Sequence, residues 1–131
     1  CKARLDKLSA DDTFICDLKT TRDLAPHALE RSILAYSYHV KAAWYRDLYN
    51  AISGAWATWV WIFIEHAPPY DIQVWKPSDM DLRIGRSEYR AILSQYKHCL
   101  ETGNWPGIAE DIEERGLPEF YVRQYEGMEL D

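Results

Sequence analysis

The chain of 131 residues is long enough to bury one hydrophobic core, and its 47% hydrophobic and 14% aromatic content excludes a disordered protein. The net charge of −6 is unevenly spread. Residues 1–50 hold eight Lys/Arg against seven Asp/Glu, whereas residues 51–131 hold seven against fourteen. The total charge therefore gives no support for DNA binding, and it leaves room for a local basic surface in the first half.

The three cysteines, Cys1, Cys16 and Cys99, are odd in number and far apart. This spacing suits neither a disulfide framework nor a zinc or iron–sulfur site, and it predicts a reducing cytosol. The chain opens on a charged, alternating segment rather than on a signal peptide. The longest apolar run, residues 59–64, is far too short to span a bilayer. We therefore expect a cytoplasmic protein without a membrane segment.

The first predicted unit is a β-hairpin. Residues 2–8 alternate polar and apolar side chains, and Ser9-Ala10-Asp11-Asp12 is a turn-forming link. A second strand follows within residues 13–21, where Phe14, Ile15 and Cys16 form an apolar run. Two strands joined by so short a link are expected to pair antiparallel.

A long amphipathic helix is predicted next. Asp23 is its candidate N-cap, Pro26 suits its first turn, and Gly54 marks its end. Its apolar residues recur at steps of three and four, at Leu29, Ile33, Tyr36, Val40, Trp44, Leu48 and Ile52. A second stripe at the same spacing runs along the flank of the first, at Tyr38, Lys41, Tyr45 and Tyr49.

The second half holds two more strands and a helix. Residues 56–66 are dense in aromatic and β-branched side chains and predict a buried strand, which Pro68-Pro69 ends. Residues 70–75 alternate as its partner strand. Ser78 or Asp79 is expected to cap a second long helix that stops at Gly103-Asn104. Its apolar positions include Leu82, Tyr89, Ile92, Leu93, Tyr96 and Leu100, with Tyr89, Tyr96 and Leu100 expected in the core. The remainder is expected to be irregular with one short helical turn.

The resulting order is β-β-α-β-β-α, which predicts an α/β fold in a single domain over residues 1–131. The first long helix is long enough for a crossover connection, so the strands on either side of it are expected to be parallel. The prediction is a mixed β-sheet with flanking helices.

Two charges stand in the apolar second strand, at Asp17 and Lys19. Residues i and i+2 of a strand point to the same face, so the two side chains project side by side. A simple ion pair at a strand end is one explanation. The other is a metal site, because the hairpin brings Asp6 close to Asp17. Both carboxylates and the carbonyl of Leu18 are oxygen ligands of the kind that Mg²⁺ binds, and Lys19 can orient a water and neutralise developing charge.

The arrangement Asp6, then Asp17-Leu18-Lys19, resembles the PD-(D/E)xK nuclease superfamily, with Leu5 where many members carry proline. The likeness extends to the exodeoxyribonuclease VIII type of phage and prophage exonuclease, which is related to lambda exonuclease. Similar segments follow in the same order at residues 16–21, 38–45, 63–70, 85–90 and 100–107.

This resemblance implies a restriction-endonuclease-like core and a Mg²⁺-dependent exonuclease, with Mn²⁺ as a possible substitute, that degrades one strand of linear double-stranded DNA. It also implies recombination or repair beside a single-strand annealing protein, and a ring-like homo-oligomer.

Relatives usually carry glutamine four residues before the helix tyrosine, whereas this chain has Lys41 four residues before Tyr45. The i,i+4 spacing keeps both residues on one helix face, where Lys41 can reach the site or a phosphate, compete with Lys19 or repel the metal. Relatives also have an N-terminal helical portion that adds an acidic or histidine group, and we expect this chain to lack it.

The rival hypothesis is a catalytically impaired module with the nuclease fold that binds DNA or a partner protein. Lys41, the expected lack of the N-terminal portion and the negative total charge favour it. Thr20 and Thr21 are candidate contacts to the DNA backbone. His27, His39, His66 and His98 show no ligand spacing and are expected to be structural or exposed. Trp56, Trp59 and Trp61 are expected in the core or at an interface.

Overall fold

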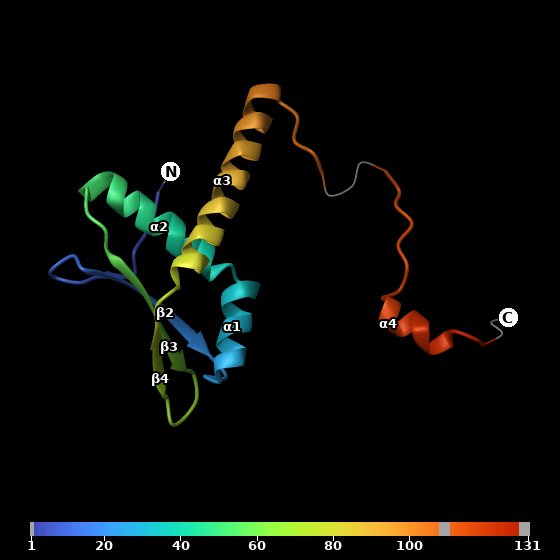
Figure 1. Cartoon of the computed structure of the whole chain (residues 1–131), viewed down its shortest axis with the longest axis horizontal. Coiled ribbons are helices and arrows are strands. Elements are labelled where there is room, and N and C mark those ends of the chain that lie inside the picture. The colour runs from blue at the N-terminus through green and yellow to red at the C-terminus, as the bar shows by residue number, and fades with distance from the viewer. Residues whose placement is uncertain (1, 108–110, 129–131) are drawn as a thin grey trace. The chain divides into compact units, whose positions relative to one another are not determined.

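The computed structural model describes residues 2–107 and 111–128. The chain forms two compact units, Cys1–Lys97 and His98–Asp131. The first unit contains a four-stranded sheet in the order β1-β2-β3-β4, with bounds Lys7–Leu8, Phe14–Thr21, Thr58–Glu65 and Ile72–Trp75. Figure 1 shows β2, β3 and β4 side by side, with α1 (Pro26–Ala35) and α2 (Tyr38–Ser53) next to them.

The strand pairings confirm the predicted mixed sheet. β1 and β2 are antiparallel, β2 and β3 are parallel, and β3 and β4 are antiparallel. The parallel pair is the one that the helical connection separates, as a crossover requires. The strand predicted over residues 2–8 is wrong in extent, because only Lys7 and Leu8 pair with β2.

One face of the sheet forms the core. Because side chains alternate along a strand, β2 and β3 bury Ile15 and Asp17 together with Trp59, Trp61 and Phe63. These residues cluster with Leu29 of α1, Ala42 and Ala43 of α2, and Leu82. The prediction of a buried strand at residues 56–66 is therefore correct for one face only, since Val60, Ile62 and Ile64 are half-buried. Phe14, Leu18, Ile72 and Val74 on that second face are exposed.

The predicted long helix is in fact two helices. α1 ends at Ala35, α2 begins at Tyr38, and Ser37 between them has a left-handed backbone with φ 51°. The three-and-four spacing continues across this break, so periodicity alone did not reveal it. The N-cap of α1 is Ala25, not Asp23. The Asp23 carboxylate instead accepts a hydrogen bond from the backbone N–H of Ala25. Gly54 ends α2 as predicted, with φ 75°.

The long helix α3 (Asp79–Thr102) begins as the sequence predicts. Ser78 and Asp81 exchange hydrogen bonds, since the Ser78 hydroxyl accepts from the Asp81 N–H and the Asp81 carboxylate accepts from the Ser78 N–H. Leu82 is buried and Tyr89 packs against the core. Tyr96 and Leu100 are exposed, contrary to prediction, and the apolar Ile92 is exposed as well. A helix of 24 residues is about 36 Å long, more than one small core can cover.

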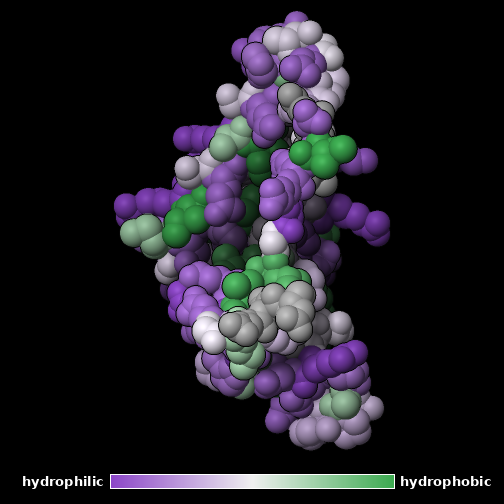
Figure 2. Space-filling view, turned by 90° about the vertical axis from the view of Figure 1, so that its right-hand side faces the viewer, coloured by the Kyte–Doolittle hydropathy of each residue, from purple (hydrophilic) through white to green (hydrophobic). Residues whose placement is uncertain are grey.

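Hydrophobic side chains also reach the surface. The space-filling view shows hydrophobic residues among hydrophilic ones on the face turned toward the viewer (Figure 2). Trp56 is exposed, whereas the neighbouring Trp59 and Trp61 are buried as predicted.

Within the second unit, α4 (Glu119–Val122) and the 3-10 turn Arg123–Tyr125 are the short helical segment that was expected there. Across residues 2–107 and 111–128, no helix has both the length and the apolar character needed to cross a bilayer.

Candidate active site

Asp17 is the buried centre of the predicted site. It lies on β2 between Ile15 and Lys19, on the face that packs against the helices, and its side chain is 1% exposed. In the parallel register it stands directly beside Trp61 of β3. A buried carboxylate is rare unless it is paired or binds an ion. Asp17 therefore requires a counter-charge or a bound ion close by, which a surface carboxylate does not.

Asp6 joins Asp17 at the open edge of β2. The Asp6 carboxylate accepts a hydrogen bond of 3.1 Å from the backbone N–H of Leu18. Since β1 starts only at Lys7, this side chain takes the place of a strand partner there. The N–H and C=O of one residue in a strand point to the same side. The Leu18 carbonyl thus faces the edge on which Asp6 lies, and all three predicted metal ligands are neighbours.

Lys19 contacts the same carboxylate. Its ammonium forms an ion pair with Asp17 Oδ2, and it lies 4.7 Å from the centre of the Tyr38 ring. The ion pair does not have hydrogen-bond geometry, so Oδ2 is a buried oxygen without a hydrogen-bond partner among the described residues. The two readings of Asp17 and Lys19, ion pair and active site, are therefore compatible. The pair exists, and it holds Oδ2 by charge contact rather than by a hydrogen bond.

Lys41 reaches the other oxygen of Asp17. Its ammonium lies 2.5 Å from Oδ1 and 5.2 Å from the centre of the Tyr45 ring. Burial alone would lower the pKa of Lys41, but the hydrogen bond to Asp17 and the charge of that carboxylate outweigh burial and raise it. Tyr45 in turn packs edge-on against Trp59 at 5.9 Å. The helix thus brings Lys41 and Tyr45 to the site, as their i,i+4 spacing predicts.

The oxygens at this edge fit a hard divalent cation. The described residues contain no group of three His, Cys, Asp or Glu side chains arranged around a metal position. They do offer two carboxylates and the Leu18 carbonyl, and Mg²⁺ is typically held by one or two carboxylates and completed by water and substrate. Each Asp17 oxygen already has an ammonium group against it, so a cation bound at this donor set would take the place of one of these contacts. The assignment of Asp6, Asp17 and Leu18 as ligands stays a prediction.

A polar cleft adjoins the end of β2. Its volume is about 710 Å³, and Thr20, Thr21, Arg22 and His66 contribute to its lining. The Thr21 hydroxyl donates to the Asp23 carbonyl, so this threonine is engaged within its own loop. Tyr36 also lines the cleft and stacks on Tyr38 at 5.5 Å, which connects the cleft to Lys19. The predicted contact of Thr20 and Thr21 with DNA remains a prediction.

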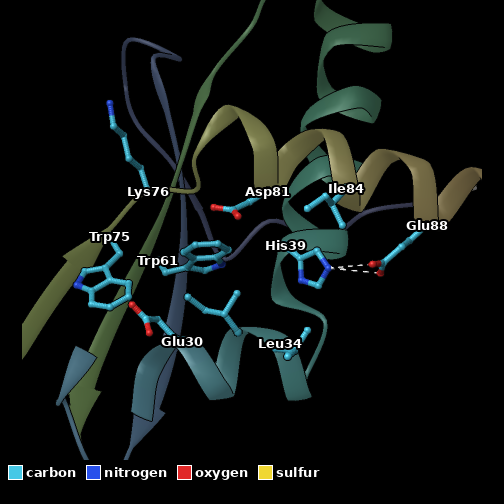
Figure 3. Close-up of a pocket in the computed structure, with 10 residues that line it drawn as sticks. Glu30, Leu34, His39, Trp61, Trp75, Lys76, Asp81, Ile84 and Glu88 are labelled. Carbon is cyan, nitrogen blue, oxygen red and sulfur yellow. Dashed lines mark hydrogen bonds and ion pairs between the residues drawn. The ribbon is translucent and has the colours of Figure 1, made fainter. Parts of the chain in front are cut away.

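A second pocket of about 420 Å³ lies between the helices and the strands β3 and β4 (Figure 3). Its lining includes Trp61, Trp75, His39 and Glu88, but neither Asp6 nor Asp17. The His39 imidazole faces the Glu88 carboxylate at 3.3 Å, as the dashed lines in Figure 3 indicate. The Trp61 indole N–H is buried without a hydrogen-bond partner among the residues described. No sequence pattern indicated this pair, since His39 and Glu88 are 49 residues apart.

Comparison with protein families supports the nuclease fold. A family model described as a PDDEXK-like domain of unknown function (DUF3799) matches residues 1–115, which include every predicted site residue. A search of curated proteins found no match. The mixed sheet with flanking helices fits the restriction-endonuclease-like fold expected of such a domain.

Proposed function

The chain belongs to this PDDEXK-like family, and from that premise we propose that it is a divalent-metal-dependent nuclease that hydrolyses phosphodiester bonds in DNA. One observation carries the proposal. Asp17 is a buried carboxylate that lies beside Asp6 and in contact with the ammonium groups of Lys19 and Lys41 at the open edge of β2.

Asp6, Asp17 and the Leu18 carbonyl would hold Mg²⁺, or Mn²⁺ in its place. When bound, the cation supplies charge neutralisation at the phosphate and lowers the pKa of a water nucleophile. The chain's own residues do the remaining work. Asp17 and Leu18 orient the site from a rigid strand, and Lys19 donates hydrogen bonds to the attacking water and to the phosphate oxygen that gains negative charge. Tyr45, wedged between Lys41 and Trp59, keeps the helix side of the site in place.

The more specific proposal is an exonuclease acting on one strand of linear double-stranded DNA. Its support is the resemblance of residues 16–21, 38–45, 63–70, 85–90 and 100–107 to exodeoxyribonuclease VIII-type enzymes. The same resemblance supports a role in phage-type recombination or DNA repair beside a single-strand annealing protein, in a homo-oligomer, within a bacterial or phage-infected cell.

The cleft beyond β2 offers a path for the DNA strand. Arg22 and His66 can contact phosphates there, and Tyr36 and Tyr38 lead from the cleft to Lys19. Phosphate contacts position the strand without reading its sequence, as a general exonuclease requires. All of the acidic excess lies in residues 51–131, away from Arg22 in sequence.

The deciding experiment compares linear with covalently closed circular duplex DNA, in Mg²⁺ and in EDTA. We expect loss of the linear DNA only, and only with Mg²⁺. Asp17→Asn and Lys19→Met should abolish this loss, whereas the exposed controls Asp71→Asn and Lys76→Met should retain it. Lys19→Met should still bind Mn²⁺ in a calorimetric titration, which separates a catalytic role from metal ligation. Degradation that persists in both site variants would refute the site.

The contact between Lys41 and Asp17 favours a second candidate, a nuclease-fold module with little or no activity. At 2.5 Å, Lys41 takes an oxygen that a metal would use. This candidate predicts DNA or partner binding by the wild-type protein, no degradation in Mg²⁺ or Mn²⁺, and no heat of metal binding that depends on Asp6 and Asp17.

A further inference from the structure

Two ammonium groups share the carboxylate of Asp17. Lys19 contacts Oδ2 and Lys41 contacts Oδ1, so each oxygen of this buried group has a cation against it. In the proposed function the same carboxylate is a metal ligand. A divalent cation placed here with both ammonium groups in position would meet strong repulsion at short range. One lysine must therefore withdraw before the metal binds.

The structure distinguishes the two lysines. The Lys19 side chain is 14% exposed and packs over the Tyr38 ring. It also arises only two residues from Asp17 on the same strand, which limits how far it can move away. The Lys41 side chain is 32% exposed and comes from α2 on a long flexible stem. Lys41 also borders an open apolar hollow with Trp44, Tyr89 and Leu93, so space is available beside it. Lys41 is the group that can leave.

The burial of the Asp17 carboxylate also accounts for the presence of Lys41 beside Lys19. A carboxylate that is 1% exposed is costly without a counter-charge, and a metal-free protein must supply that charge itself. Lys19 alone leaves Oδ1 without a partner. The ammonium of Lys41 fills that position at 2.5 Å.

We propose that Lys41 is the resident counter-ion of the metal site: it neutralises Asp17 while no divalent cation is bound and yields Oδ1 when one binds. This inference rests on the proposed function, because it takes Asp6 and Asp17 as the metal ligands. Metal binding is then an exchange of one cation for another. Lys41 therefore lowers the affinity of the site for metal, which a salt bridge outside the ligand set would not do.

The test is calorimetric titration with Mn²⁺ alone, without DNA, on four proteins. Lys41→Gln removes the competing charge and should bind Mn²⁺ at least about tenfold more tightly than the wild type. Lys41→Arg keeps the charge in a planar, two-pronged form and should bind Mn²⁺ more weakly than the wild type. Lys76→Gln is the matched control on an exposed lysine outside the site, and it should match the wild type.

Thermal unfolding gives an independent readout. In EDTA, Lys41→Gln should melt below the wild type, because Asp17 has lost a counter-charge. In saturating Mn²⁺ this deficit should disappear, because tighter binding adds more stability. If Lys41→Gln does not fold without metal, the Mn²⁺ affinity of Lys41→Arg relative to the wild type decides the question.

The outcomes distinguish a failure of the counter-ion role of Lys41 from a failure of the nuclease proposal. Mn²⁺ binding by the wild type, with unchanged or weaker binding by Lys41→Gln and no weakening by Lys41→Arg, overturns the counter-ion role and leaves the nuclease proposal intact. Absence of Mn²⁺ binding in both the wild type and Lys41→Gln overturns both proposals.

Discussion

Gly85 of α3 lies against the backbone of His39 of α2. A Cβ atom placed on Gly85 would stand 2.5 Å from the His39 carbonyl oxygen and 2.8 Å from its carbonyl carbon. The close approach fixes how the start of α3 crosses the start of α2, the helix that carries Lys41 and Tyr45. Position 85 therefore affects the site without touching it.

Gly85→Ala should destabilise the protein by about 1–3 kcal/mol, because the clash is with backbone atoms that cannot turn aside. In an uncrowded helix, replacing glycine by alanine would stabilise the protein by roughly 1 kcal/mol. A loss of stability would therefore show that the clash with His39 outweighs this gain. Urea denaturation measures the change. Gly116→Ala is the matched control, since a Cβ there meets nothing within 4 Å, and it should leave the transition unchanged. A stabilised Gly85→Ala variant would contradict the close packing.

A second connection between the helices predicts a pH dependence. Asp47 of α2 accepts two hydrogen bonds from Arg86 of α3, at 2.6 and 2.7 Å, and one from the Tyr89 hydroxyl. Burial alone would raise the pKa of Asp47, but the bonds from Arg86 and Tyr89 outweigh burial and hold it below its ordinary value of 3.8. Its stabilisation is therefore complete above that value and is lost as the pH falls through the lowered pKa.

Asp47→Asn should lower the free energy of unfolding by about 1–3 kcal/mol near neutral pH. The difference between the variant and the wild type should shrink as the pH falls below about 4. Denaturation curves at a series of pH values provide the measurement, with Asp71→Asn as the exposed control. A difference of constant size down to low pH would show that the charge of Asp47 contributes little.

The polar cleft beyond β2 leads to a prediction about DNA. Arg22→Gln should weaken binding to duplexes of different sequence by similar factors, because a phosphate contact carries no sequence information. The slope of log K against log salt should become shallower by about 1. Fluorescence anisotropy in a Mg²⁺-free buffer measures both the affinity for DNA and its dependence on salt. Arg83→Gln, an exposed arginine on α3, is the control, and an equal loss in both variants would exclude a specific role for the cleft.

Local sequence patterns predicted most of the fold. The apolar run in residues 13–21, the turn at residues 9–12 and the glycine at position 54 predicted β2, the hairpin and the end of α2, and the structure confirms all three. The break at Ser37 escaped prediction because apolar spacing continues through it. The exposure of Tyr96 escaped too, since a helical stripe shows which residues share a face and not whether anything covers that face.

The proximity of Asp6, Asp17 and Lys19 could be predicted because they are close in sequence or on neighbouring strands. Asp17 and Lys19 are two residues apart, and the hairpin brings in Asp6. The contact between Lys41 and Asp17 needed the structure, because the sequence placed the lysine near the site without saying which atom it meets. The pair of His39 and Glu88 had no sequence signal at all.

The left-handed Ser37 between α1 and α2 separates two helical registers. In one continuous helix, a single inserted residue would rotate everything after it by about 100° and turn Lys41 and Tyr45 away from Asp17. With the break in place, α2 takes its phase from its own first turn. Insertions or deletions within α1 can then be absorbed at residues 36–37, and the helix that forms one wall of the site is free to stay constant while its neighbour diverges.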